Sequence, residues 1–147
     1  MCAAAAAHVL AVEDDGAVRG FLCRALESGG YVPLPVRTGE EALSALRSSD
    51  LAAALIDGIL PDMHGVRLAR EMLNDPASAR TAICFVTGAI RESVPAVAGM
   101  TALSKPLRLS ELLSTLDALM RWREEGSVAA ARLEALQTLE QGFLVGP

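Results

Sequence analysis

Residues 54–65 read Ala-Leu-Ile-Asp-Gly-Ile-Leu-Pro-Asp-Met-His-Gly, and this stretch decides the fold. An uninterrupted apolar run ends on one carboxylate, Asp57, and a turn marked by Pro61 and Gly65 follows before a helical pattern begins near Val66. Such a run is typical of a strand buried on both faces, as in a parallel sheet covered by helices. The sequence therefore predicts that Asp57 lies at the carboxyl end of a buried strand, where α/β proteins bind their ligands.

Strands and helices alternate along the rest of the chain. Predicted strands cover residues 8–12, 31–36, 51–57, 82–86 and 101–104, and predicted helices cover residues 17–28, 39–47, 66–73, 92–98 and 109–123, the fourth being short and weak. Pro33 and Pro35 remove two backbone donors from the second strand, which therefore belongs at an edge. The pattern predicts an α/β fold with a doubly wound, five-stranded parallel sheet in the order 2-1-3-4-5.

Polar side chains follow the predicted strands at the points where the strands end. Right-handed crossovers bring all carboxyl ends to one edge of the sheet, so this edge gathers five side chains, those of Glu13, Asp14, Asp57, Thr87 and Lys105. Three neighbouring carboxylates repel one another and need a hard cation, for which oxygen ligands with room for water favour Mg²⁺. Asp57 is then the predicted nucleophile toward phosphorus, with Lys105 and Thr87 stabilising the transferred group.

Bulk composition restricts the function classes. The chain has 147 residues, 52% of them hydrophobic and 3% aromatic, which suits one domain with an aliphatic core. A net charge of −5 argues against direct nucleic-acid binding, and no apolar run is long enough to span a membrane. The cysteines, Cys2, Cys23 and Cys84, are odd in number and lack metal-ligand spacing. We predict reduced thiols in a cytoplasmic protein, with Cys23 and Cys84 buried in the core.

Four motifs carry a resemblance to a known family. They are Val-Leu-Ala-Val-Glu-Asp-Asp at 9–15, Leu-Ile-Asp with Leu-Pro-Asp-Met-His-Gly within 55–65, Phe-Val-Thr-Gly at 85–88, and Ser-Lys-Pro-Leu at 104–107. Residues from about 8 to 122 resemble the receiver domain of two-component response regulators. The resemblance implies a flavodoxin-like fold, phosphotransfer from a histidine kinase or a phosphotransfer protein, dependence on Mg²⁺, and a downstream protein target.

The resemblance also implies a role for each matching residue. Asp57 is the phosphoacceptor, and Thr87 and Lys105 respond to the phosphoryl group. Asp14 ligates Mg²⁺ directly, Glu13 does so through water, and the backbone carbonyl of Ile59 completes the protein ligands. The peptide bond before Pro106 is expected to be cis.

Two departures from the family pattern bear on how the domain signals. Ala102 stands where the family usually carries an aromatic residue, and the segment between Thr87 and Lys105 is shorter than usual. The usual threonine–aromatic coupling is therefore not expected here. The alternative function is a phosphorylation-independent receiver that acts as a binding adaptor.

Other readings of the acidic residues fit less well. A phosphatase would place a general acid two residues after the nucleophile, where Ile59 stands, so we predict no enzymatic turnover. Ile59 and Ala89 also cannot orient a hydrolytic water, which predicts slow loss of the phosphoryl group. A dinucleotide module would need a glycine-rich loop where the sequence has acids. Asp15 is expected to cap a helix, and Asp62 and His64 to serve the turn.

The chain divides into three predicted parts. Residues 1–7 form a disordered leader, residues 8–123 the receiver domain, and residues 124–147 a helical extension with a helix over 128–143. Twenty or so residues cannot form an output domain, so the chain reads as a single-domain regulator or as a receiver excised from a longer protein. The extension helix is amphipathic and must bury one face. We predict a homodimer through these C-terminal helices, with folding back onto the same domain as the alternative.

Overall fold

The computed structural model describes residues 6–88, 90, 94–125 and 129–142. Strands and helices alternate as predicted. The strands are β1 (His8–Val12), β2 (Val32–Val36), β3 (Ala53–Asp57), β4 (Ala82–Thr87), β5 (Val94–Val97) and β6 (Met100–Ser104). The helices are α1 (Gly16–Ser28), α2 (Gly39–Ser48), α3 (Gly65–Leu73), α4 (Leu109–Glu125) and α5 (Ala129–Gln141), with a 3₁₀ turn, η1, over Pro76–Ser78.

One sheet of six strands forms the centre of the molecule, in the order β2-β1-β3-β4-β6-β5. The first five strands in this order are mutually parallel, which confirms the predicted order, because β6 is the strand expected at 101–104. The proline-containing β2 lies at one edge and pairs only with β1, as its missing donors require. The carboxyl ends of β1, β3, β4 and β6 therefore lie side by side.

The prediction of a helix over residues 92–98 is wrong. Residues 94–97 form β5, which pairs antiparallel with β6 through a tight turn at Ala98 and Gly99. Both turn residues have positive φ, 54° and 72°, which reverses the chain within two residues. Residues 94–104 thus form a hairpin of β5 and β6 in place of the predicted helix. Residues 92 and 93 of the predicted helix lie outside the described part of the chain.

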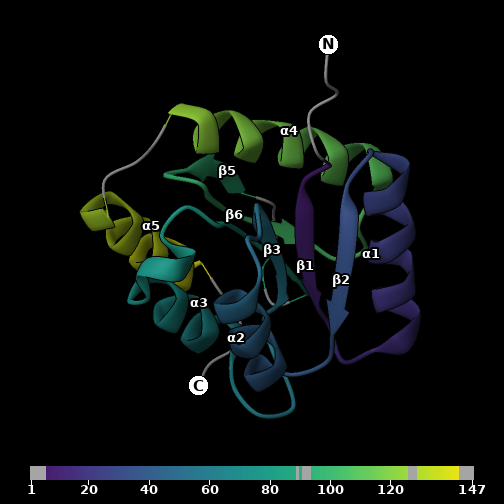
Figure 1. Ribbon diagram of the computed structural model, residues 1–147, viewed down its shortest axis with the longest axis horizontal. Helices are drawn as coiled ribbons and strands as arrows, with labels where there is room; N and C mark the ends of the chain where they lie inside the picture. Colours follow the sequence, from purple (N-terminus) through teal and green to yellow (C-terminus); the bar gives the residue numbers. More distant parts are fainter. Residues whose placement is uncertain (1–5, 89, 91–93, 126–128, 143–147) are drawn as a thin grey trace.

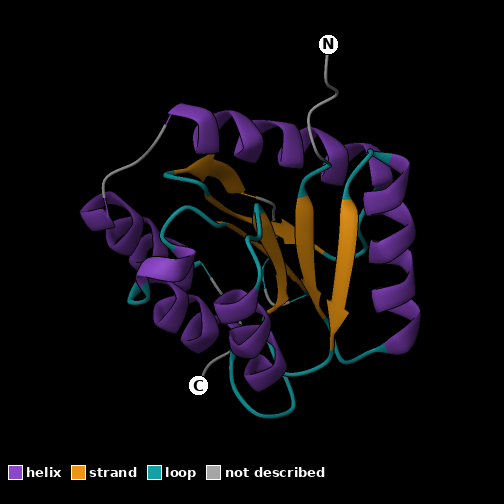
Figure 2. Ribbon diagram, viewed as in Figure 1, coloured by secondary structure: helices purple, strands orange, loops and turns teal. Residues whose placement is uncertain are grey.

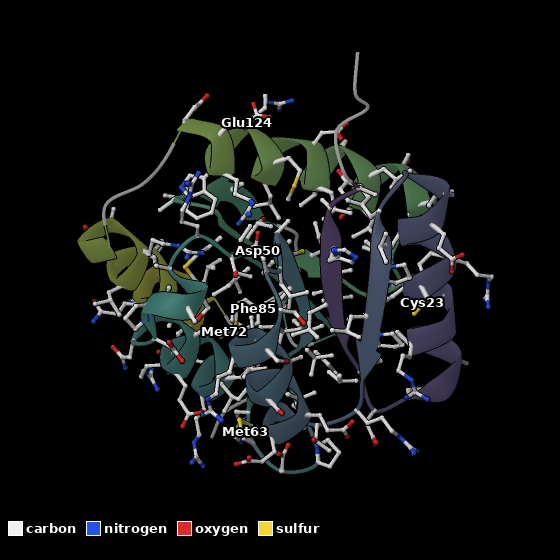
Figure 3. The ribbon with its side chains drawn as sticks, in the orientation of Figure 1. Cys23, Asp50, Met63, Met72, Phe85 and Glu124 are labelled. Atoms are coloured by element: carbon white, nitrogen blue, oxygen red, sulfur yellow. The ribbon has the colours of Figure 1, made fainter. Side chains whose placement is uncertain are left out.

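Helices cover both faces of the sheet, as Figures 1 and 2 show. One face packs against α1 and α4, with a core of small and aliphatic side chains that includes Val9, Leu55 and Leu116. The other face packs against α2, α3 and α5, and Figure 3 shows Phe85 of β4 near Met72 of α3 in this layer. The strand residues of both cores are almost fully buried, which explains their uninterrupted apolar sequence.

Side chains that the sequence marked as caps begin two of the helices. Thr38 accepts a hydrogen bond from the backbone N–H of Glu41 at 3.1 Å and begins α2. Asp15 accepts from the N–H groups of Ala17 and Val18 at 2.9 and 3.0 Å and begins α1, which confirms its structural role.

Helix α5 folds back onto its own domain, where it packs against α3, β5 and β6. Its apolar side chains, Ala135, Leu136 and Leu139, are buried in the same core as Ala102. Each buried leucine contributes about 2 kcal/mol to stability. The face on which the predicted homodimer depends is therefore already buried within the chain. The alternative, folding back, is confirmed.

Arg132 interrupts the apolar face of α5 and is itself only 2% exposed. Its guanidinium donates to the carbonyl oxygens of Ala79, Thr81 and Ala98 at 3.0, 2.7 and 3.1 Å. It also lies 4.4 Å from the centre of the Trp122 ring, a cation–π contact. Burial lowers the pKa of Arg132 to about 10, which leaves it charged at neutral pH. One side chain thus ties α5 to η1, β4, the β5–β6 turn and α4.

Two smaller predictions concern the cysteines and the peptide bond before Pro106. Cys84 is fully buried as predicted, but Cys23 is only half-buried on α1, so that part of the prediction is wrong. The Lys105–Pro106 peptide bond is cis. Among the described helices, none is both long and apolar enough to cross a membrane.

Candidate functional site

The candidate site is the carboxyl edge of the sheet. Asp57 is the last residue of β3 and Thr87 the last of β4, while Glu13 and Lys105 directly follow β1 and β6. Because these four strands are neighbours in the sheet, the four side chains start from adjacent positions. The backbone N–H of Lys105 donates to the carbonyl of Thr87 at 3.0 Å, which extends the pairing of the two strands to the site.

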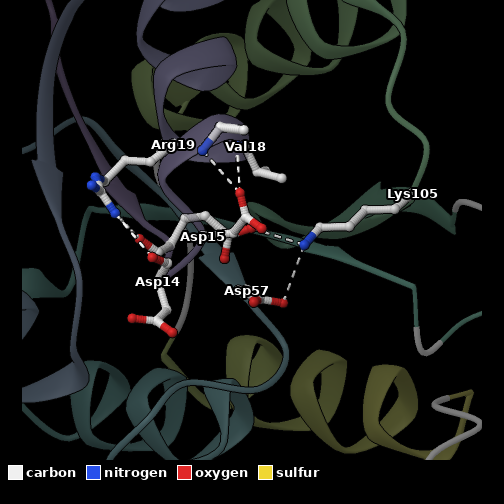
Figure 4. A network of polar contacts seen from close by, with 8 residues as sticks. Asp14, Asp15, Val18, Arg19, Asp57 and Lys105 are labelled. Atoms are coloured by element: carbon white, nitrogen blue, oxygen red, sulfur yellow. Dashed lines mark hydrogen bonds and ion pairs between the residues drawn. The ribbon is translucent and has the colours of Figure 1, made fainter.

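Lys105 lies between two carboxylates, as Figure 4 shows for Asp57. Its Nζ donates to Glu13 Oε1 at 2.9 Å and lies 3.6 Å from Asp57 Oδ1. The side chain of Glu13 is 2% exposed, that of Asp57 19% and that of Lys105 29%. Asp57 is therefore held by rigid elements and remains open to solvent at its tip.

The charges at this edge are not balanced. Burial, together with the neighbouring carboxylate of Asp57, raises the pKa of Glu13 from 4.5 to about 7, although Lys105 acts in the opposite direction. Burial alone would lower the pKa of Lys105, but the hydrogen bond to Glu13 and the charge of Asp57 outweigh it and raise that pKa. The second oxygen of Glu13, Oε2, is buried without a hydrogen-bond partner. The site therefore has capacity for one more positive group.

The predicted metal ligands are only partly assembled. Within the described ranges, no three His, Cys, Asp or Glu side chains come close enough together to hold a metal ion. Glu13 and Asp57 converge on Lys105, whereas Asp14 is exposed and its carboxylate lies apart from that of Asp57 (Figure 4). The donor set nevertheless fits Mg²⁺, since it consists of carboxylate oxygens and includes the unpartnered Oε2 of Glu13.

A tight turn after Asp57 fixes the direction of this residue. Gly65 donates its N–H to the carbonyl of Gly58 at 2.9 Å, and a side chain at Gly65 would collide with the carbonyl of Asp57. Glycine is therefore required where α3 begins. Ile59, two residues after Asp57, is 53% exposed.

Asp62 belongs to the same turn but binds a different element. Its carboxylate accepts from the backbone N–H groups of Gly39 and Glu40 at 2.9 and 3.0 Å and so caps α2 together with Thr38. The hydrogen bond from Gly39 lowers the pKa of Asp62. This residue is structural, as predicted, and it fastens the turn after Asp57 to the neighbouring helix.

Thr87 and Ala102 stand on adjacent strands beneath the helices. Thr87 is 2% exposed, and Ala102 is fully buried, opposite Phe85 in the register of β4 and β6. The methyl group of Ala102 joins the core that contains Leu136 and Leu139 of α5. Ala102, where the family resemblance leads us to expect an aromatic ring, is thus a packed core position.

An apolar groove of about 570 Å³ adjoins Lys105. It lies between α1 and the β6–α4 connection, and its lining is Ala17, Val18, Phe21, Leu22, Val86, Lys105, Pro106 and Leu107. A larger cavity of about 850 Å³ lies at the opposite edge of the sheet, by His8, Leu51 and Arg80. The strand-end acids are absent from the lining of that cavity, so the smaller groove is the one that bears on the site.

Sequence reasoning missed one residue at this edge, Arg19 of α1. Its Nη1 donates to the backbone carbonyls of Glu13 and Asp14 at 3.0 and 3.1 Å. The available signal was a basic residue one turn into the helix that follows the acidic triplet. Side-chain-to-backbone contacts of this kind leave no pattern in a sequence.

Comparison with known proteins identifies the family of this chain. The family model for the response regulator receiver domain matches residues 9–117. The response regulator receiver protein CpdR of Brucella abortus is 30% identical over 117 residues, which cover 77% of this chain and 96% of CpdR. The response regulator MprA of Mycolicibacterium vanbaalenii is 31% identical over 119 residues, 78% of this chain, and the aligned part spans 50% of MprA.

Solved structures show the same architecture. A sensor protein from Polaromonas sp. JS666 aligns with a TM-score of 0.70 and 26% identity, covering 80% of this chain and 98% of that one. A CheY-like receiver domain from Methanospirillum hungatei aligns with a TM-score of 0.69 over 83% of this chain and 100% of that one, at 23% identity, which supports the fold alone. With its strand order, its strand-end acids and these relatives, the chain belongs to the response regulator receiver domain family of two-component systems.

Proposed function

We propose that Asp57 accepts a phosphoryl group from a histidine kinase or a histidine phosphotransfer protein, with Mg²⁺ bound beside it. The observation that supports this most directly is the pairing of a solvent-accessible carboxylate with an ammonium group at a strand end. Asp57 is accessible at its tip and lies 3.6 Å from Lys105, which is itself anchored by Glu13. A nucleophile and a charge-neutralising group are thus within reach of one incoming phosphoryl group.

The proposed transfer is a substitution at phosphorus. An oxygen of Asp57 forms the new O–P bond while the P–N bond to the donor imidazole breaks, and that nitrogen takes up a proton from solvent. Lys105 neutralises charge on the transferred group, and Thr87 supplies a hydroxyl from the next strand end. Asp14 and Asp57 would hold Mg²⁺ directly, Glu13 through water and Ile59 through its carbonyl, and the ion would offset the charge of the phosphoryl oxygens.

The groove beside Lys105 supports docking of the donor protein. Its lining is mostly apolar, with Val18, Phe21 and Leu107 open to a partner, and it ends at the ammonium group that faces Asp57. A donor that buried apolar side chains there would bring its phosphohistidine to the sheet edge. We place this exchange, and the switching of a downstream protein target that follows it, in the cytoplasm, which the free thiols of Cys23 and Cys84 favour.

One observation favours a second candidate function. Ala102 offers no ring that could change position with the state of Thr87, and it is fully buried. A receiver domain built this way could act as a phosphorylation-independent binding adaptor. Its partner affinity would then be the same for the modified and unmodified protein.

Phosphorylation with a small donor tests whether Asp57 is the phosphoacceptor. Incubation with acetyl phosphate and Mg²⁺ is expected to add one phosphoryl group, measured by intact mass, and Asp57→Asn is expected to abolish the addition. The matched control is Asp50→Asn, because the side chain of Asp50 is 93% exposed and far from the site in the fold. Labelling that persists in Asp57→Asn would refute the assignment. A folded wild-type protein that takes up no phosphoryl group from acetyl phosphate or a kinase would favour the adaptor.

A further inference from the structure

We infer that Arg19 is a positioning residue for the metal site, because its guanidinium fixes the peptide that carries Glu13 and Asp14. This inference rests on the proposed function, since it requires that these acids hold Mg²⁺. Arg19 itself touches neither Asp57 nor Lys105 through any contact described above. Its role is to set where the acidic side chains begin.

The contacts of Arg19 are unusually specific in geometry. A single nitrogen, Nη1, donates to two consecutive carbonyl oxygens, those of Glu13 at 3.0 Å and Asp14 at 3.1 Å (Figure 4). Two successive carbonyls that converge on one donor restrict the rotation of the backbone between them. The direction of each Cα–Cβ bond follows from the backbone, so this contact sets where the side chains of Glu13 and Asp14 begin.

The turn that carries Glu13, Asp14 and Asp15 is also held by hydrogen bonds on both sides of this peptide. The N–H of Glu13 donates to the carbonyl of Val36 at 3.1 Å, which fastens the turn to the end of β2. Asp15 caps α1 and so fastens the other side. Arg19 supplies the middle contact, at the two residues that the proposed metal site uses. Groups that orient metal ligands from outside the coordination shell commonly change metal affinity 10- to 100-fold when removed.

Charge and position predict opposite effects for the loss of Arg19. A positive group near the site repels a cation, so removing only its charge would tighten Mg²⁺ binding. Losing the hold of Arg19 would weaken Mg²⁺ binding, because the backbone from which the carboxylates of Glu13 and Asp14 reach the ion would no longer be fixed. The sign of the change in affinity therefore distinguishes the two effects.

The experiment compares Arg19→Met and Arg19→Lys with wild type and with Arg24→Met, an exposed position on the same helix. Titration calorimetry gives the Mg²⁺ dissociation constant, and thermal unfolding without Mg²⁺ gives Tm. We expect Mg²⁺ affinity to fall about tenfold in Arg19→Met and to fall also in Arg19→Lys, since an ammonium lacks the rigid guanidinium fork. Arg24→Met should match wild type.

Phosphorylation by acetyl phosphate provides a second readout. The rate of Arg19→Met should recover to the wild-type maximum at saturating Mg²⁺, with only the required Mg²⁺ concentration raised. Unchanged or tighter Mg²⁺ binding in Arg19→Met would overturn the inference. So would wild-type affinity in Arg19→Lys, or a lower Tm with no change in affinity, which would assign Arg19 to fold stability. If the wild type itself bound no Mg²⁺, the proposed function would fail instead.

Discussion

Replacing Glu13 by Gln is expected to remove most of the pH dependence of folding stability between about pH 4.5 and 7. The pKa of Glu13 is raised from 4.5 to about 7 by burial and by Asp57, so the native state binds this proton more tightly than the unfolded chain. Between these two values the unfolded state carries fewer protons, and the free energy of unfolding falls as pH rises. The stability that protonated Glu13 contributes is thus complete at low pH and is lost above about pH 7.

The size of the effect follows from the shift. One pKa unit corresponds to about 1.4 kcal/mol, so a shift from 4.5 to about 7 amounts to about 3 kcal/mol. Gln resembles the protonated acid, because its carbonyl can accept from Lys105 while its amide can donate to Asp57. We expect the variant to unfold with nearly the same free energy as wild type at pH 4.5 and to be more stable by up to about 3 kcal/mol at pH 8.

Urea unfolding followed by far-ultraviolet circular dichroism, in buffer without Mg²⁺, measures this difference. Asp50→Asn serves as the control, since its exposed carboxyl should leave the pH profile unchanged. Saturating Mg²⁺ should raise the stability of wild type at pH 8 more than that of Glu13→Gln, because a bound cation offsets the charged carboxylate. A Gln variant that loses as much stability as wild type between pH 4.5 and 8 would refute the reasoning.

Three further outcomes follow from the same structure. Ile59→Asn should change the rate at which the acyl phosphate on Asp57 hydrolyses, because an amide can orient water and the Ile59 side chain cannot. The decay of the phosphorylated mass measures this rate, and an unchanged and rapid decay in both proteins would count against the prediction. Arg132→Met should lower the free energy of unfolding in a urea titration by about 3 kcal/mol, because it leaves buried carbonyls without a donor. The control Arg121→Met, at an exposed position, should leave the free energy of unfolding unchanged. The 147-residue chain should sediment as a monomer at high micromolar concentration, because the apolar face of α5 is buried within the chain. A concentration-dependent dimer that is lost on removal of residues 126–147 would show otherwise.

The strand-end site was predictable because its signals are local. An apolar run that ends at Asp57, a proline-rich edge strand and the caps at Asp15 and Thr38 are all written in short segments. Right-handed crossovers then bring the carboxyl ends of the parallel strands to one edge of the sheet. The contacts between Lys105 and the two carboxylates follow from that edge, and they do not depend on the details of the helices.

The helix expected over residues 92–98 shows where local signals fail. Short apolar runs fit a buried helix or a strand equally well, and the choice depends on what else covers the sheet. Here α5, more than thirty residues later, packs against β5 and β6 on the face that also holds α2 and α3. Because α5 covers that face of the sheet, residues 94–97 need not form a covering helix, and they extend the sheet as β5.

The sequence by itself determined the class of fold, the strand order, the edge that gathers Asp57 and Lys105, and that the C-terminal helix must bury one face. The tertiary structure alone decided where that face goes and how Arg132 can lie within it. The physical reason is that a helix carries the need for burial in its own periodicity, whereas its partner surface is assembled from distant segments. The carbonyls of Ala79, Thr81 and Ala98, which accept the hydrogen bonds of Arg132, meet only once the chain has folded.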